Sequence, residues 1–138
     1  MNTTIIFCCF CNVDVDARLT SGKEIYPKRS DLSDLPFWIC DKCGNFVGCH
    51  HKTADKTKPL GCIPTISIRN ERVQIHYIIE KSIKDGLSTK PQFYKEMSAR
   101  AGRNYHTAEI RTIEEAITMK AIARSVASYF KKQQRSEL

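Results

Sequence analysis

The segment Cys8-Cys9-Phe10-Cys11 is followed, after 28 intervening residues, by a second cysteine-bearing segment, Cys40-Asp41-Lys42-Cys43. Two Cys-x-x-Cys pairs in one short segment are typical of a single tetrahedral zinc site, in which each pair turns both of its sulfurs toward one ion. Four thiolates at about 2.3 Å complete a closed structural site. The gap exceeds the roughly 15–20 residues usual between such pairs, and we attribute the excess to an enlarged hairpin.

The choice of ligands has alternatives near both pairs. Within Cys8–Cys11, the outer two cysteines have the two-residue spacer that a knuckle needs, although Cys9 lies beside them. Cys49, His50 or His51 could replace one thiolate to give a Cys3His site. Neighbouring residues on a strand point to opposite faces, so these three cannot all ligate together. The favoured zinc ligands are Cys8, Cys11, Cys40 and Cys43.

The composition is that of an ordinary soluble protein, with 138 residues, 41% hydrophobic and 27% charged. No apolar run approaches the ~18 residues that span a bilayer, so no membrane partner is expected. The start, MNTTIIFCCFC, lacks a basic region and a cleavage site, which predicts a cytoplasmic location. Because disulfides are disfavoured inside cells, metal explains the seven cysteines better than bridges do.

Charge is distributed unevenly along the chain, whose net charge is +7. Residues 1–64 carry eight basic and seven acidic side chains, whereas residues 65–138 carry fourteen and eight. The turn-rich segment 53–64 predicts a boundary between a zinc-ribbon domain at 1–64 and a basic helical domain at 65–138. Positive charge favours a polyanionic partner, although it also serves solubility.

The first half has strand and turn patterns. Residues 3–8 and 13–19 read as strands, and we expect Glu24–Tyr26 to pair back as the other arm of a hairpin. A polar loop at 27–36 leads to the second knuckle. Gly44 can supply the positive φ that the turn needs, and 45–48 reads as a final strand. The nearby aromatic residues could stack on bases, but a core this small favours packing for Phe7, Phe10, Phe37, Trp38 and Phe46.

The second half changes to a helical period. A helix is predicted over 66–83 with Gly86 as its stop, and Thr89 and Pro91 open the next. Residues 112–115 match a capping box, and the tail from residue 131 is expected to fray. The fold class is therefore α+β, a zinc-ribbon hairpin head followed by a bundle of about three helices. The expected apolar faces of the first and last helices include Val73, Ile75, Ile78, Ile79, Ile83, Ile113, Ala116, Ile117, Ile122, Val126 and Phe130.

A series of motifs then follows the chain in order: Cys8-x-x-Cys11, Glu24-Ile25-Tyr26-Pro27, Phe37-Trp38-x-Cys40-x-x-Cys43, Val47-Gly48-Cys49-His50, Lys58-Pro59-Leu60-Gly61, and Arg69 with His76. The series resembles a zinc-finger-containing family of small proteins, of zinc-ribbon type, common in bacteriophages and prophages. The resemblance implies zinc, supports the four favoured ligands, and implies a bacterial host cell. The chain departs from the usual knuckle at Cys9 and Asn12, where Pro and Gly are common.

Nucleic-acid binding is the usual inference from such a finger, and DNA or RNA is the expected partner. The side chains expected to contact phosphates are Arg100, Arg103, Arg111, Lys120, Arg124, Lys131 and Lys132. The alternative is a protein-binding adaptor that modulates a host polymerase, nuclease or defence complex. Catalysis is disfavoured, because four thiolates close the metal shell and no HExxH or paired-carboxylate motif is present. The sequence leaves the oligomeric state open.

Overall fold

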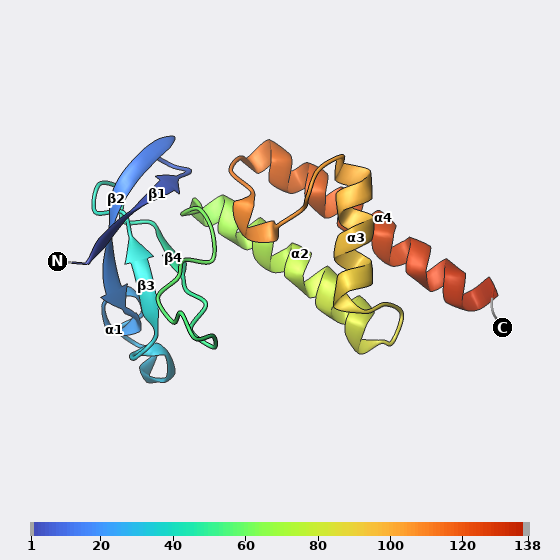
Figure 1. Ribbon diagram of the computed structural model, residues 1–138, viewed down its shortest axis with the longest axis horizontal. Coiled ribbons are helices and arrows are strands. Elements are labelled where there is room, and N and C mark those ends of the chain that lie inside the picture. The colour runs from blue at the N-terminus through green and yellow to red at the C-terminus, as the bar shows by residue number, and fades with distance from the viewer. Residues whose placement is uncertain (1, 137–138) are drawn as a thin grey trace. The chain divides into compact units, whose positions relative to one another are not determined.

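The computed structural model describes residues 2–136, which divide into two compact units between Ile66 and Ser67. The first, here the sheet unit, contains a four-stranded antiparallel sheet, and the second, the helical unit, contains three long helices (Figure 1). The expected α+β class, with a cysteine-bearing head and about three helices after it, is confirmed.

The sheet is a meander in which each strand pairs with the next along the chain. Residue alternation puts Ile6 opposite Val15 and Trp38 opposite Val47, and all four side chains are buried. The Trp38 indole N–H donates to the carbonyl of Thr57 at 2.7 Å, which satisfies the polar end of this buried ring. The strands are β1 (Thr3–Cys8), β2 (Val13–Ser21), β3 (Pro36–Ile39) and β4 (Phe46–Gly48).

The expected second arm of the hairpin at Glu24–Tyr26 is wrong. Its first residues belong to a short helix, α1 (Gly22–Ile25), and β2 pairs with β3 instead. Gly22 explains the difference, because its backbone is buried against the loop that follows. A Cβ added there would lie 1.7 Å from the Leu32 carbonyl oxygen, and the Gly22 N–H donates to the carbonyl of Leu35 at 2.9 Å. The loop therefore folds back onto the end of β2.

Aromatic packing around the sheet follows the expectation, with one exception. The rings of Tyr26, Phe37 and Phe46 meet edge to face with centroids 5.5–5.9 Å apart. Phe10, at the tip of the first knuckle, is instead 67% exposed. Packing therefore accounts for these rings but not for Phe10.

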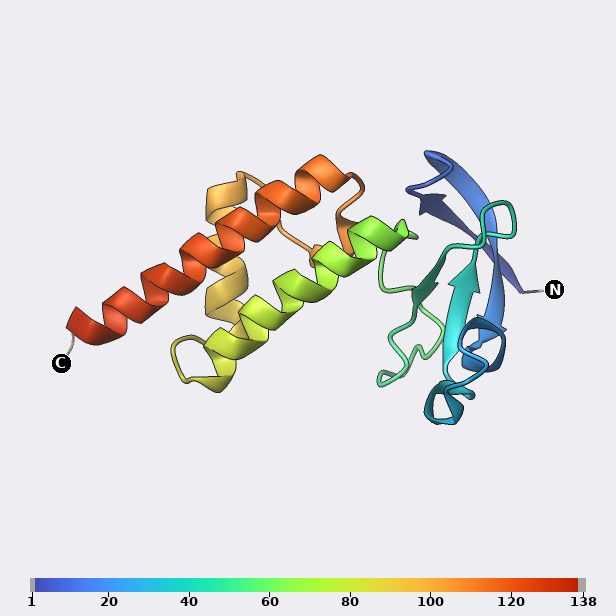
Figure 2. The ribbon, with the colours of Figure 1, turned by 180° about the vertical axis from the view of Figure 1, so that it is seen from behind.

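The helical unit contains α2 (Ile66–Lys84), α3 (Lys90–Ala101) and α4 (Ile113–Ser136), and Figure 2 shows α2 and α4 running alongside each other. The predicted signals at the helix ends are present. Thr89 and Gln92 form a capping box at the start of α3, and the Thr112 hydroxyl accepts from the Glu115 N–H at 3.1 Å before α4. Gly86 follows α2 with a φ of 72°. No helix within residues 2–136 is long and apolar enough to cross a membrane.

The buried faces of α2 and α4 are shifted from those expected. Val73 and Ile117 are 61% and 54% exposed, whereas Met119 and Ala123 are buried. On α2, Arg72 occupies a buried position because its guanidinium donates to the Ile110 carbonyl at 2.6 Å. In the tail, where fraying was expected from residue 131, α4 continues to Ser136; residues 137 and 138 lie outside the described residues. The helical core includes Ile68, Ile75, Ile79, Phe93, Met97, Tyr105, Ile110, Ala116 and Val126.

Candidate metal centre

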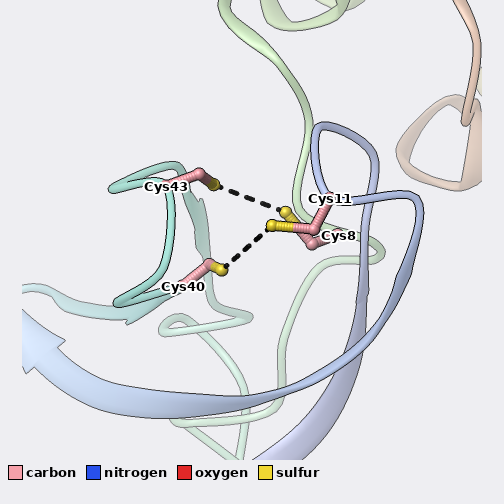
Figure 3. A group of neighbouring side chains, drawn as sticks. All are labelled: Cys8, Cys11, Cys40 and Cys43. Atoms are coloured by element: carbon pink, nitrogen blue, oxygen red, sulfur yellow. Dashed lines mark hydrogen bonds between the residues drawn. The ribbon is translucent and has the colours of Figure 1, made fainter.

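Four sulfur atoms gather between the two knuckles, where those of Cys8, Cys11, Cys40 and Cys43 all lie within 4.8 Å of one another (Figure 3). The sulfurs of Cys8 and Cys43 are 3.6 Å apart, and those of Cys11 and Cys40 are 3.8 Å apart. A tetrahedron with zinc–sulfur bonds of about 2.3 Å has edges of roughly 3.8 Å. The donor set and its spacing therefore fit one zinc ion.

The two knuckles have the same backbone turn. In the first, the Asn12 N–H donates to the Cys8 carbonyl at 2.7 Å; in the second, the Gly44 N–H donates to the Cys40 carbonyl at 2.7 Å. Each donor stands four residues after the first cysteine and has a positive φ, 59° at Asn12 and 81° at Gly44. Asparagine is among the few non-glycine residues that adopt this conformation readily. The first knuckle thus keeps its turn although it lacks glycine.

Burial and hydrogen bonds shift the pKa values of the clustered thiols in different directions. Burial raises the pKa of Cys8 to about 12, against the opposing effect of backbone N–H donors from Cys11 and Phe10. Burial also acts to raise the pKa of Cys43, but the Asn45 N–H and neighbouring thiols bring it below its usual value. The Asn45 side-chain amide adds a donor 3.4 Å from the same sulfur. A divalent ion would release the thiol protons and neutralise the charge left behind.

The alternative ligands lie outside this cluster. Cys49 is buried in the core of the sheet unit, and its backbone forms a bridge to Pro59. His51 places Nδ1 3.3 Å from the Cys49 carbonyl oxygen, and the His50 N–H donates to the carbonyl of Lys58. Cys9 lies beside Cys62, 3.7 Å between sulfurs. The four-cysteine set is therefore preferred over Cys3His, and such a closed shell suits a structural site.

An ion-pair network that contacts the second knuckle was not predicted from the sequence. Arg18 on β2 donates to both carboxylate oxygens of Asp41, each at 2.9 Å, and to both of Glu24 at 3.0 and 3.1 Å. The Arg18 guanidinium lowers the pKa of Asp41, which lies within the second knuckle. Arg18 stands opposite Ile39, the residue before Cys40, so only the strand register could have revealed this contact.

The cations expected to contact nucleic acid fall into two groups. Several are engaged by carboxylates within the helical unit: Arg100 pairs with Glu96, Arg103 with Glu115, and Lys120 with Glu71 at 2.6 Å. Arg100 also donates to Ser125 and lies over the Tyr129 ring. The others have exposed side chains, namely Arg111 before α4, and Arg124, Lys131 and Lys132 on α4.

The sheet, the two knuckles and the four converging thiols define a zinc-finger protein. Residues 4–128 match the family described as a zinc-finger-containing domain, and the chain belongs to that family. No curated protein and no solved structure was found to match the chain. Zinc as the cofactor agrees with both the family and the geometry of the thiols.

Proposed function

We propose that this protein is a zinc-ribbon type nucleic-acid-binding protein, in which the zinc site folds the sheet unit and α4 supplies the phosphate contacts. A closed thiolate shell has no open position for catalysis, so its role is to hold two hairpins together. An origin in a phage or prophage, and hence a bacterial cytoplasm, remains what the sequence resemblance implies.

The observation that carries this proposal is a basic stripe along α4, formed by Arg124, Lys131 and Arg135. Intervals of seven and four residues put these three on one side of the helix. All three are exposed, and they span about 16 Å along the axis. The buried side of α4, which includes Ala123 and Val126, lies away from the stripe. A row of cations of this length can follow a sugar–phosphate backbone and gives no reason for sequence selectivity.

Fluorescence anisotropy with random single- and double-stranded oligonucleotides, at low and high salt, tests the proposal. The zinc-loaded protein should bind at low salt and lose affinity steeply as salt is added. Changing Arg124, Lys131 and Arg135 together to Gln should weaken binding and reduce the slope of log K against log[salt] by about 2–3.

The matched control removes the same charge from the sheet unit, by changing Lys23, Lys28 and Lys56, which are all exposed, to Gln. Under the proposal this control lowers affinity less than the α4 variant does. Equal losses in the two variants would mean that net charge, and not the basic stripe, attracts the nucleic acid.

A second candidate is the protein-binding adaptor, which one surface feature favours. Val73 and Tyr77, one turn apart on α2, are 61% and 68% exposed, and apolar side chains so placed suit a protein partner. If the protein binds neither kind of oligonucleotide even at low salt, nucleic-acid binding is contradicted and the adaptor is the better explanation.

A further inference from the structure

Two cysteines outside the zinc cluster lie in contact. The sulfurs of Cys9 and Cys62 are 3.7 Å apart, although the residues are 53 positions apart in the chain. Backbone hydrogen bonds hold their segments together: the Cys9 N–H donates to the Ile63 carbonyl, and the Ile63 N–H donates to the Phe7 carbonyl, both at 2.8 Å. The two thiols are therefore neighbours because of the architecture of the sheet unit.

A second zinc site does not explain this pair. Among the described residues, the group found with three or more donors close enough to hold a metal is the four-cysteine cluster, and neither Cys9 nor Cys62 belongs to it. Two thiolates alone are too few for a closed zinc shell. Apolar packing suits Cys62, which is 4% exposed, whereas Cys9 is only half-buried.

We propose that Cys9 and Cys62 form a redox-modification site, which a two-electron oxidant of the peroxide class converts to a disulfide. This site is distinct from the zinc centre and does not depend on nucleic-acid binding. A disulfide bond measures about 2.05 Å, so the sulfurs need to approach each other by about 1.7 Å. Thiol pairs that oxidise in this way inside cells are typically transient and redox-sensing.

The reaction has two balanced steps. The Cys9 sulfur attacks one peroxide oxygen; the sulfur–oxygen bond forms, the oxygen–oxygen bond breaks, and the departing hydroxide takes up the proton released by the Cys9 thiol and leaves as water. The Cys62 sulfur then attacks the sulfur of the Cys9 sulfenic acid. The disulfide forms, the sulfur–oxygen bond breaks, and the hydroxyl leaves as a second water with the Cys62 proton. Two thiols lose two electrons in total, and peroxide gains them.

We assign the attack on peroxide to Cys9, because it is only half-buried, and the attack on the sulfenic acid to Cys62, because it is buried. Neither residue is in the ligand set, so the disulfide can form while zinc stays bound. The resulting link would tie the turn of the first knuckle to the segment after β4.

The test treats the zinc-loaded full chain with one equivalent of hydrogen peroxide, followed by trypsin digestion without reductant. We expect a cross-linked pair of peptides covering residues 1–18 and 57–69, at a mass lower by two hydrogens than the sum of the two peptides. Fragmentation should place the bond at Cys9, and the zinc content should be unchanged. Because this measurement uses the wild-type chain, it does not depend on the folding of any variant.

Variants then sharpen the assignment. Cys9→Ser and Cys62→Ser should each abolish the cross-link, whereas Cys49→Ser, at another buried cysteine outside the zinc cluster, should keep it. Three results would overturn the proposal: no cross-link between these peptides, a bond located at Cys8 or Cys11, or oxidation that begins with loss of zinc.

Discussion

The cores of the two units of this protein are built from different kinds of residue. Among the described residues, the core cluster of the sheet unit has nine buried members, and three of them are cysteines, including Cys8 and Cys40 of the four-cysteine cluster. The helical unit instead buries large apolar side chains such as Phe93 and Met97, both 0% exposed. A sheet with a three-residue last strand has little apolar area to bury, so a metal must supply what the core lacks. The two units should therefore lose their structure for different reasons.

Removal of zinc should have the largest effect, and only on the sheet unit. The free energy of zinc binding in zinc-finger peptides is about 10–16 kcal/mol, and it becomes free energy of folding. Trp38 is the single tryptophan and is buried in the sheet unit, so its fluorescence reports that unit alone. Far-ultraviolet circular dichroism reports mainly the helices of the other unit. A strong chelator should shift the Trp38 emission toward that of exposed indole and leave most of the helical signal.

Adding zinc back should restore the Trp38 emission, and this recovery would distinguish reversible unfolding from irreversible damage to the protein. Two outcomes would contradict the idea that zinc stabilises the sheet unit alone. Either the emission stays unchanged after complete zinc removal, or the helical signal disappears together with it.

A substitution in the helical core should have the opposite effect, destabilising the helical unit and leaving the sheet unit intact. Phe93→Ala should cost about 3–5 kcal/mol, because it leaves a cavity among fully buried side chains. Thermal unfolding followed by circular dichroism should show the loss, while zinc content and Trp38 emission stay those of the wild type. Ile117→Ala is the matched control: its side chain is 54% exposed, and the change should stay within about 0.5 kcal/mol.

The stability of the sheet unit should depend on the close backbone contact at Gly22 as well as on the bound metal. Gly22→Ala should destabilise it by about 1–3 kcal/mol, because the new methyl group would overlap the Leu32 carbonyl. Gly48→Ala serves as the control, since its nearest neighbour would be the flexible Leu60 side chain at 3.4 Å. Denaturant titration of the Trp38 emission measures both. Equal midpoints for the two variants would contradict the role given to Gly22 in closing the loop.

Features set by local spacing were predictable from the sequence. Two Cys-x-x-Cys pairs indicated the four cysteines that the structure brings together, because each pair forms its own turn, and the Thr89 cap acts on residues three positions away. Contacts that depend on how strands distant in sequence pair with each other were not predictable. The Arg18–Asp41 contact and the replacement of the Glu24–Tyr26 arm by β3 both depend on that register.

The apolar faces of the helices were predicted only in part, for a related reason. Periodicity indicates that a helix is amphipathic, but the neighbouring helices decide which side is covered. Val73 and Ile117 fit an apolar pattern and yet are exposed, and Arg72 breaks the pattern and yet is buried because the Ile110 carbonyl accepts from it.

The smallest expected effects are at the two knuckle turns, which differ in one residue. Gly44 has a φ of 81° and open space around a would-be Cβ, so Gly44→Ala should cost about 1–2 kcal/mol through backbone strain alone. Gly44→Asn should cost less, because the first knuckle shows that asparagine is accepted at the equivalent position. Asn12→Gly should change stability by only a few tenths of a kcal/mol, since glycine relieves the strain but makes the unfolded chain more flexible. Zinc affinity measured by competition with a chromophoric chelator should follow the same ranking. If Gly44→Asn proved as costly as Gly44→Ala, the likeness of the two turns would not extend to their energetics, and contacts of the Asn12 side chain would have to account for the first knuckle.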